Sequence, residues 1–165
     1  MMAEHVRKAE TKDASRIAEI IVSYNHEIIH ERLYDDPARF NKFQVLPLAL
    51  HFQNDKGALK GIRVYDDGII KGVLYMTQNG RKLEVNSLYV DPLFHNAGVG
   101  QALSQAAAET LAEKDAEVMH VWVNEQDLHK RMLYSNAGFE MTGNRRPDPT
   151  FDKDELEYIV TKKGE

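Results

Sequence analysis

The spacing of hydrophobic positions in the first third of the chain predicts a short strand followed by two helices. Residues 11–30, TKDASRIAEIIVSYNHEIIH, repeat apolar side chains at helical intervals, and Thr11 or Asp13 can cap this helix. The apolar positions that recur at this spacing are Ile17, Ile20, Ile21, Tyr24 and Ile28. Residues 33–57 are less regular, and a second helix can precede their NDKG turn. The opening EHVRKAE can form the strand.

The rest of the chain alternates between strand and helix patterns. Residues 61–92, GIRVYDDGIIKGVLYMTQNGRKLEVNSLYVDP, predict three strands, because DDG and NG place glycine in hairpin turns. A small-residue helix is predicted over 99–115 and a strand with Trp122 in the core over 116–124. A helix over 127–138 is closed by Gly138, and residues 138–144 and 154–163 can form an antiparallel pair. This order indicates an α/β (α+β) fold with helices packed on one sheet.

Composition narrows the function classes. The 165 residues, 42% of them hydrophobic, suit a single domain over 1–165. The formal charge of −5 argues against nucleic acid as a partner and mildly favours cations. The absence of cysteine excludes disulfides, thiolate metal ligands and an acyl-cysteine intermediate, and fits a cytoplasmic protein. The start MMAEHVRKAE has no apolar core and the apolar runs are short, so we expect neither a secretory signal nor membrane insertion.

One stretch between a predicted strand and a predicted helix has the chemistry of an anion site. Residues 83–103, LEVNSLYVDPLFHNAGVGQAL, turn at Asp91-Pro92 and carry Gly98 and Gly100 where the helix begins. Glycine lets a ligand approach the backbone, and the free N–H groups and dipole of a helix start favour phosphate. The stretch is not a Walker loop, and it lacks the third glycine of a dinucleotide fingerprint. A plain strand-to-helix turn is the alternative explanation.

The stretch resembles motif A of the GNAT superfamily of N-acetyltransferases. In that motif a strand ending V-x-P precedes R/Q-x-x-G-x-G/A, and Val90-Asp91-Pro92 with HNAGVG at 95–100 matches in order and spacing. Residues 123–143, VNEQDLHKRMLYSNAGFEMTG, are similar to the family block N-x-x-N-x-x-A-x-x-x-Y-x-x-x-G-F. The matching positions of that block are Asn124, Tyr134, Gly138 and Phe139.

The resemblance implies the GNAT acyl-CoA N-acyltransferase fold, a central mixed, mostly antiparallel sheet flanked by helices and with splayed central strands. It implies acetyl-CoA as acyl donor, without a metal. The pyrophosphate would rest on the amides of 98–101, and the pantetheine arm would pair with backbone near 88–90, between strands 83–90 and 117–124. The cofactor-binding residues implied in this way are Leu88, Tyr89, Val90, His95, Asn96, Ala97, Gly98, Val99, Gly100, Gln101, Asn124 and Asp127.

Two of these positions depart from the family pattern. His95 stands where the family usually has Arg or Gln, and a neutral imidazole brings less charge to phosphate. Asp127 stands where a second Asn is frequent, and its carboxylate can cap the following helix instead of contacting a polyanion. Both changes keep open a second hypothesis, a GNAT-fold module that binds CoA without catalysis.

Amide formation requires a base and an acid, because an alkylammonium with a pKa of about 10 must lose a proton and the leaving thiolate must gain one. The resemblance implies Tyr134 as general acid and Glu84 as general base, acting directly or through water. Asn86 lies two residues on and could hold that water. A backbone N–H near Leu88 or Tyr89 would stabilise the oxyanion. A core tyrosine and a solvent-facing strand glutamate are the alternatives. Without cysteine, direct attack in a ternary complex is the natural mechanism.

The sequence HEIIH at 26–30 matches the H-E-x-x-H pattern of zinc metallopeptidases. The pattern lacks a third ligand, because Glu31, Asp35 and Asp36 lie too close or in a predicted loop. A peptidase based on His26 and His30 is therefore a remote alternative. The resemblance implies that this segment borders the acceptor site, so its candidate substrate contacts are Tyr24, His26, His30 and Tyr34. Asn86, which could hold the water beside Glu84, is a further candidate.

The leading hypothesis is thus an acetyl-CoA-dependent N-acetyltransferase acting on a primary amine. Small polyamines, aminoglycosides, amino acids and protein amino groups all remain open as acceptors. The expected partners include neither nucleic acid nor membrane, and a homodimer is possible because dimers are frequent in the family.

Overall fold

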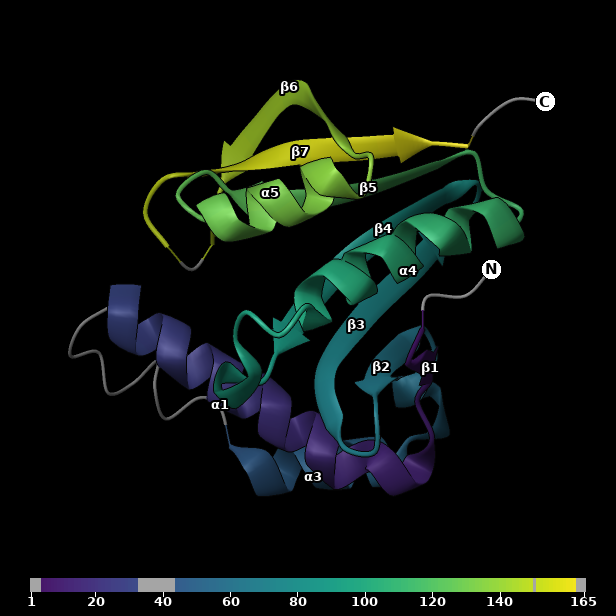
Figure 1. Cartoon of the computed structure of the whole chain (residues 1–165), viewed down its shortest axis with the longest axis vertical. Coiled ribbons are helices and arrows are strands. Elements are labelled where there is room, and N and C mark those ends of the chain that lie inside the picture. The colour runs from purple at the N-terminus through teal and green to yellow at the C-terminus, as the bar shows by residue number, and fades with distance from the viewer. Residues whose placement is uncertain (1–3, 33–43, 150, 163–165) are drawn as a thin grey trace.

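The computed structural model describes residues 4–32, 44–149 and 151–162 (Figure 1). Its strands form one mixed sheet in the order β1-β2-β3-β4-β5-β7-β6, in which only the pair β4–β5 is parallel. The strands are β1 Val6–Lys8, β2 Ile62–Asp66, β3 Ile70–Asn79, β4 Lys82–Val90, β5 Val118–Asn124, β6 Glu140–Pro147 and β7 Asp154–Thr161.

Four α-helices and three short 3-10 turns complete the described part of the chain. The helices are α1 Ala14–Arg32, α3 Val45–Asn54, α4 Val99–Glu113 and α5 Leu128–Asn136, and the turns are η1 Thr11–Asp13, η2 Lys56–Leu59 and η3 Pro92–Phe94. The expected order of strands and helices is therefore confirmed, as is the mixed, mostly antiparallel sheet.

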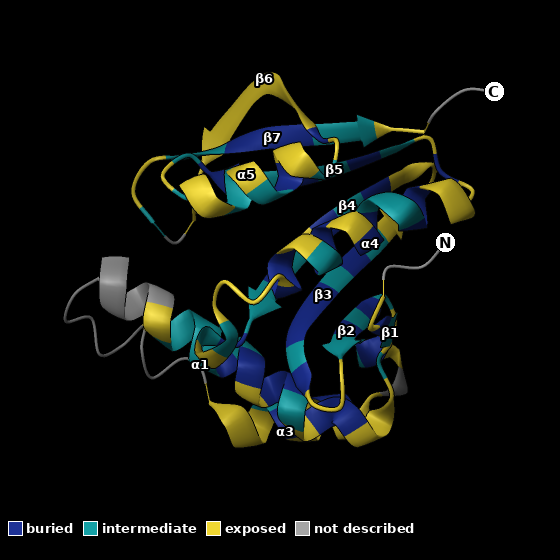
Figure 2. Ribbon diagram, in the orientation of Figure 1, coloured by how far each residue is buried: buried dark blue, intermediate teal, exposed yellow. Residues whose placement is uncertain are grey.

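The helices cover both faces of the sheet, and the core has a layer on each side (Figure 2). Val73 packs in the layer under α1 and α3, whereas its neighbour Leu74 packs in the layer under α4 and α5. Successive side chains of a strand point to opposite faces, so β3 is buried on both. The expectation that Trp122 is core was wrong: it is only half-buried, and the Arg146 guanidinium stacks on its ring at 4.3 Å.

Helix α4 approaches β3 closely because Gly72 has no side chain. A Cβ at this position would lie 2.6 Å from Val99 Cγ1 and 2.8 Å from Leu103 Cδ1. Both neighbours are buried on α4, at 1% and 0% exposure, so neither can move aside without shifting the helix.

Replacing Gly72 by alanine is expected to destabilise the fold by about 1–3 kcal/mol, because the added methyl overpacks the contact between β3 and α4. Thermal unfolding should show a lower Tm. Gly57→Ala is the matched control, since its Cβ would meet only the Asp55 side chain at 3.3 Å. Equal melting temperatures for the two variants would contradict the close seating of α4.

The two central strands separate along their length. Pairing of β4 with β5 covers Lys82–Val85 and Val118–Val121, and beyond these residues the described strands are no longer paired. Figure 1 shows β4 and β5 together at one end and apart at the other. The edge of β4 that follows Val85 therefore faces the gap, as expected for splayed strands.

A β-bulge lies at the point of separation. In the β3–β4 ladder Tyr75 is opposite Ser87 and Met76 is opposite Val85, so Asn86 has no partner. A bulge interrupts the two-residue period of a strand, and here the interruption falls between Asn86 and Ser87. Thr77 lies opposite Glu84, and its hydroxyl donates to Asn86 Oδ1 at 2.8 Å, so Asn86 lies on the same face as Glu84.

Candidate active site

The connection after β4 is fixed by Asp91, which is 5% exposed. Its carboxylate caps η3 by accepting from the Leu93 amide at 2.9 Å. Arg16 of α1 donates to the same carboxylate, and its Nε donates to the Ile70 carbonyl at 2.9 Å. The Val90-Asp91-Pro92 sequence thus turns the chain and ties the turn to α1.

Helix α4 begins without a side-chain cap. Gly98 is its N-cap residue, with φ of 82°, and Asn96 in the same loop has φ of 65°. The first intrahelical bond runs from the Ala102 amide to the Gly98 carbonyl at 3.1 Å. The amides of 99–101 consequently have no acceptor within the helix. Open space at the Gly98 Cβ position leaves this helix start accessible to an anion such as phosphate.

A cavity of about 530 Å³ opens at this helix start. Many of the implied cofactor-binding residues line it: Leu88, Val90, His95, Asn96, Gly98, Val99, Gly100, Gln101 and Asp127. Tyr24, a candidate substrate residue, also lines it. Tyr89, Ala97 and Asn124 do not. The glycine loop and the last residues of β4, Leu88 and Val90, therefore belong to one concave site.

Two residues of the cavity, His129 and Lys130, were missed in the sequence. They lie in the first turn of α5, and the His129 ring is 5.6 Å from the His95 ring. Lys130 brings a positive charge to the cavity, and His129 adds a second imidazole beside His95. The available signal was the dipeptide His129-Lys130, two residues after the capping Asp127 and therefore in the first turn of the helix. The Asp127 carboxylate accepts from the Lys130 amide at 3.1 Å, which confirms the expected capping role.

Lys130 connects the cavity to two tyrosines. Its ammonium lies 4.7 Å from the centre of the Tyr24 ring, which is packed edge-on against Tyr89 at 5.2 Å. Burial opposes the charge of Lys130, but electrostatic interactions with Tyr24, Tyr134 and Asp127 hold its pKa above the ordinary value. The cation is therefore retained at neutral pH.

Tyr134 lies on the inner side of α5 and is 2% exposed. Its ring packs against Phe139 at 5.3 Å. Burial raises the pKa of Tyr134 to about 12, an effect that the nearby Lys130 partly offsets. The hydroxyl is consequently protonated throughout the neutral range, the state that a general acid requires. Neither Tyr134 nor Glu84 lines the 530 Å³ cavity itself.

Glu84 is part of a chain of three titratable side chains. It lies opposite His120 in the β4–β5 ladder, one pair before the strands separate, and its carboxylate is 3.7 Å from His120 Nε2. His120 Nδ1 is 3.1 Å from the Glu157 carboxylate on β7. The side chains of Glu84, His120 and Glu157 are 32%, 12% and 9% exposed, so the chain leads inward from the gap.

The inner end of this chain is held ionised. Burial opposes ionisation of Glu157, but hydrogen bonds from Asn144, His120 and Thr142 outweigh it and lower the pKa. Asn144 and Thr142 both donate to Glu157 Oε1 at 3.0 Å. The sequence reading missed His120 and Glu157. For His120 the signal was a histidine within the mostly apolar strand VMHVWVN. Glu157 gave no such signal, because its strand DELEYIVT holds three acidic residues.

Asn124, implied by the resemblance as a cofactor-binding residue, does not line the 530 Å³ cavity, and its side chain bonds to other parts of the chain. Its Nδ2 donates to the Asp148 carboxylate at 2.9 Å and to the Asp152 carbonyl at 3.3 Å, and its Oδ1 accepts from the Gln126 amide at 2.9 Å. These bonds join the end of β5 to the β6–β7 connection.

The HEIIH stretch lies on α1, as predicted. Glu27 lines the cavity at the start of α4, and His26 is half-buried. The His30 side chain and all of Tyr34 lie outside the described residues. Within the described part, no three His, Asp or Glu side chains are placed to hold a metal ion. None of the described helices has the length and apolarity needed to cross a membrane.

The comparisons with known proteins agree with this geometry. The family model of the acetyltransferase (GNAT) domain matches residues 9–150, so the chain belongs to the GNAT acetyltransferase family. Uncharacterized N-acetyltransferases of Mycobacterium bovis and Mycobacterium tuberculosis are 26% identical over 81 residues, or 49% of this chain. The match spans about half the length of these relatives, 52%.

Solved structures share the fold over nearly the whole chain. The Salmonella typhimurium protein yncA, solved with its cofactor acetyl-CoA, has a TM-score of 0.71 at 19% identity, covering 97% of this chain and 94% of that one. An N-acetyltransferase of Thermoplasma acidophilum in complex with coenzyme A has a TM-score of 0.68 at 16% identity, covering 94% and 97%. The fold implied by the sequence motifs is therefore confirmed.

Proposed function

We propose that the protein transfers the acetyl group of acetyl-CoA to a primary amine by direct attack in a ternary complex. The observation that carries this proposal is the arrangement around the splayed strands. An uncapped helix start lies at the cavity end of the gap, and Glu84 lies where β4 and β5 begin to separate. The GNAT family and the acetyl-CoA found with yncA support the same donor.

The residues present fit such a donor. Backbone amides of 99–101 would receive the pyrophosphate, Lys130 would add positive charge around it, and His95 and His129 would offer ring N–H donors. The unpaired edge of β4 at 86–90 offers backbone groups to the pantetheine amides, like an added strand. When bound, acetyl-CoA supplies an activated thioester carbonyl.

Glu84 is proposed to accept a proton from the attacking ammonium, directly or through a water near Asn86. The amine nitrogen then forms a bond to the acetyl carbon while a backbone N–H near Leu88 or Tyr89 stabilises the oxyanion. As the carbon–sulfur bond breaks, Tyr134 donates its proton to the sulfur. The nitrogen, which carries a positive charge after the attack, loses its second proton to solvent as the amide forms. The proton taken by Glu84 returns to Tyr134 through solvent, so each turnover of an ammonium substrate releases one proton.

His120 and Glu157 are proposed as positioning residues for the base. Glu157 holds one ring nitrogen of His120, so the other nitrogen faces Glu84. An imidazole held between two carboxylates would fix the direction of the Glu84 carboxylate.

The test is calorimetric titration of the purified protein with acetyl-CoA, followed by assays of thiol release with a panel of amines. Saturable binding of one acetyl-CoA per chain and turnover with an amine are expected. Binding without turnover for any amine would favour the non-catalytic CoA-binding module. Stoichiometric zinc in the purified protein, together with a failure to bind acetyl-CoA, would contradict the proposal and return attention to His26 and His30.

Lys130→Gln is expected to weaken acetyl-CoA binding by about tenfold, because it removes a cation beside the phosphate-binding helix start. The same titration checks this result at low and high salt, and the difference should shrink at high salt. Lys82→Gln is the matched control, since Lys82 is exposed and lies outside the cavity. Equal affinities for both variants would remove Lys130 from the cofactor site.

A further inference from the structure

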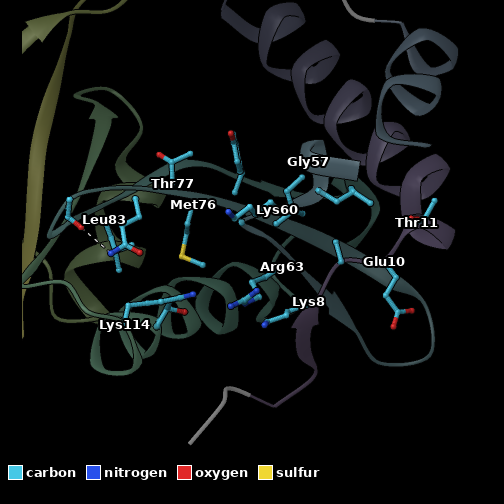
Figure 3. A pocket seen from close by; sticks show the side chains of 18 residues that line it. Lys8, Glu10, Thr11, Gly57, Lys60, Arg63, Met76, Thr77, Leu83 and Lys114 are labelled. Atoms are coloured by element: carbon cyan, nitrogen blue, oxygen red, sulfur yellow. Dashed lines mark hydrogen bonds between the residues drawn. The ribbon is translucent and has the colours of Figure 1, made fainter. Parts of the chain in front are cut away.

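A second hollow lies at the other end of α4, where β1 ends and β2 begins (Figure 3). Its volume is about 1180 Å³. Ile62, Met76 and Leu83 contribute apolar surface, and Thr77 and Gln78 contribute hydrogen-bonding groups. No residue that lines it also lines the cavity at the start of α4. The hollow is thus separate from the proposed cofactor site.

Cationic side chains from several elements line this hollow: Lys8 of β1, Lys60 after η2, Arg63 of β2 and Lys114 at the end of α4. Figure 3 shows their nitrogen ends directed toward the same part of the hollow, whereas the Glu10 carboxylate points away from it. Glu10 is paired with Lys12 at 3.2 Å. Within the described residues, none of the four cations forms an ion pair.

The positive charge that no carboxylate neutralises is clearest on β1 and β2. Lys8 and Arg63 are directly opposite each other in the antiparallel ladder, and therefore on the same face. Like charges at directly opposite positions repel and destabilise a sheet. Arg7 is the contrast, because it points to the other face and is bound by Asp13 at 2.8 Å and Asp66 at 3.0 Å. The fold neutralises the cation on one face and leaves two adjacent cations on the other.

We infer that this hollow binds a small phosphorylated compound. Its charge would offset the repulsion between Lys8 and Arg63, and Lys60 and Lys114 would complete the surround. The cations converge on one space instead of forming a track, and the net charge of the chain is −5, so a compact anion fits better than a nucleic acid. The inference is independent of acetyl transfer, because the two sites share no residue.

Titration with inorganic triphosphate tests the inference. The titration is run on the free protein and again after one equivalent of CoA, which occupies the helix start of α4 first. With CoA bound, one triphosphate per chain is expected to bind, in the hollow. Without CoA, a further triphosphate can bind at the free helix start of α4. The double variant K8Q/R63Q is expected to bind at least about tenfold more weakly. The control K82Q/K153Q removes two exposed lysines outside the hollow, and its affinity should match the wild type.

Loss of folding would not explain a negative result, because K8Q/R63Q relieves repulsion and should melt no lower than the wild type without triphosphate. The inference is overturned if triphosphate binds equally to wild type and K8Q/R63Q, or if no binding occurs at about 10 mM, well above the roughly millimolar range of weak sites. A glutamate-rich peptide that binds this hollow more tightly than triphosphate would also overturn it, and would assign the surface to an acidic protein segment.

Discussion

Tyr134→Phe is expected to lower kcat by roughly 100-fold and to leave acetyl-CoA affinity nearly unchanged, because it removes only the proton donor. The phenylalanine ring keeps the packing against Phe139, so the fold should be preserved. Steady-state assays of thiol release and calorimetry on the same samples measure the two quantities. Tyr65→Phe is the control, since Tyr65 is half-buried beside His5 and far from the gap in the sheet order.

The pH dependence of the wild type sharpens this test. A general acid works in its protonated form, which is present below its pKa, and burial raises the pKa of Tyr134 to about 12. The activity supplied by the hydroxyl should therefore persist at about pH 10, where an ordinary tyrosine is already half ionised. Full activity of Tyr134→Phe at every pH would show that Tyr134 is only a core aromatic.

Glu84→Gln is expected to lower kcat/KM at neutral pH by roughly 100-fold, because glutamine cannot accept the ammonium proton. The deficit should shrink as pH rises. An amine with a pKa of about 10 is neutral in roughly one molecule in a thousand at pH 7, but in about a quarter of molecules at pH 9.5. Assays of both proteins across this range measure the ratio.

Glu117→Gln is the matched control for this substitution, because Glu117 is exposed and pairs with Arg81 at 3.0 Å outside the gap. It should have wild-type kinetics at every pH. A constant deficit for Glu84→Gln from neutral to alkaline pH would indicate a structural role, and an unchanged rate would place the base elsewhere.

The local features of the site could be predicted from the sequence because they depend on short-range chemistry. Gly98, Gly100 and the Val90-Asp91-Pro92 turn act within a few residues of one another, so their spacing alone indicates an uncapped helix start after a strand. The two hairpins that join β2, β3 and β4 followed from the turn glycines in the same way. The capping role of Asp127 was also local and was confirmed.

The long-range features could not be predicted in this way. His120 and Glu157 are 37 residues apart, and their contact depends on β7 pairing beside β5. Asn124 finds its partners in a connection 24 or more residues later. The β-bulge between Asn86 and Ser87 could not be predicted either, because it depends on the pairing of β4 with the neighbouring strand β3. Each of these cases requires knowledge of which strands are neighbours.

The short parallel contact between β4 and β5 has a consequence for cooperativity. Strands β2 to β4 and strands β5 to β7 are each joined internally by longer antiparallel ladders, but the ladder between the two groups covers only Lys82–Val85 with Val118–Val121. They can therefore behave as two partly independent opening units, with the weakest protection at the seam. A ligand that bonds to both sides of the gap adds its binding free energy to the cohesion of the whole sheet.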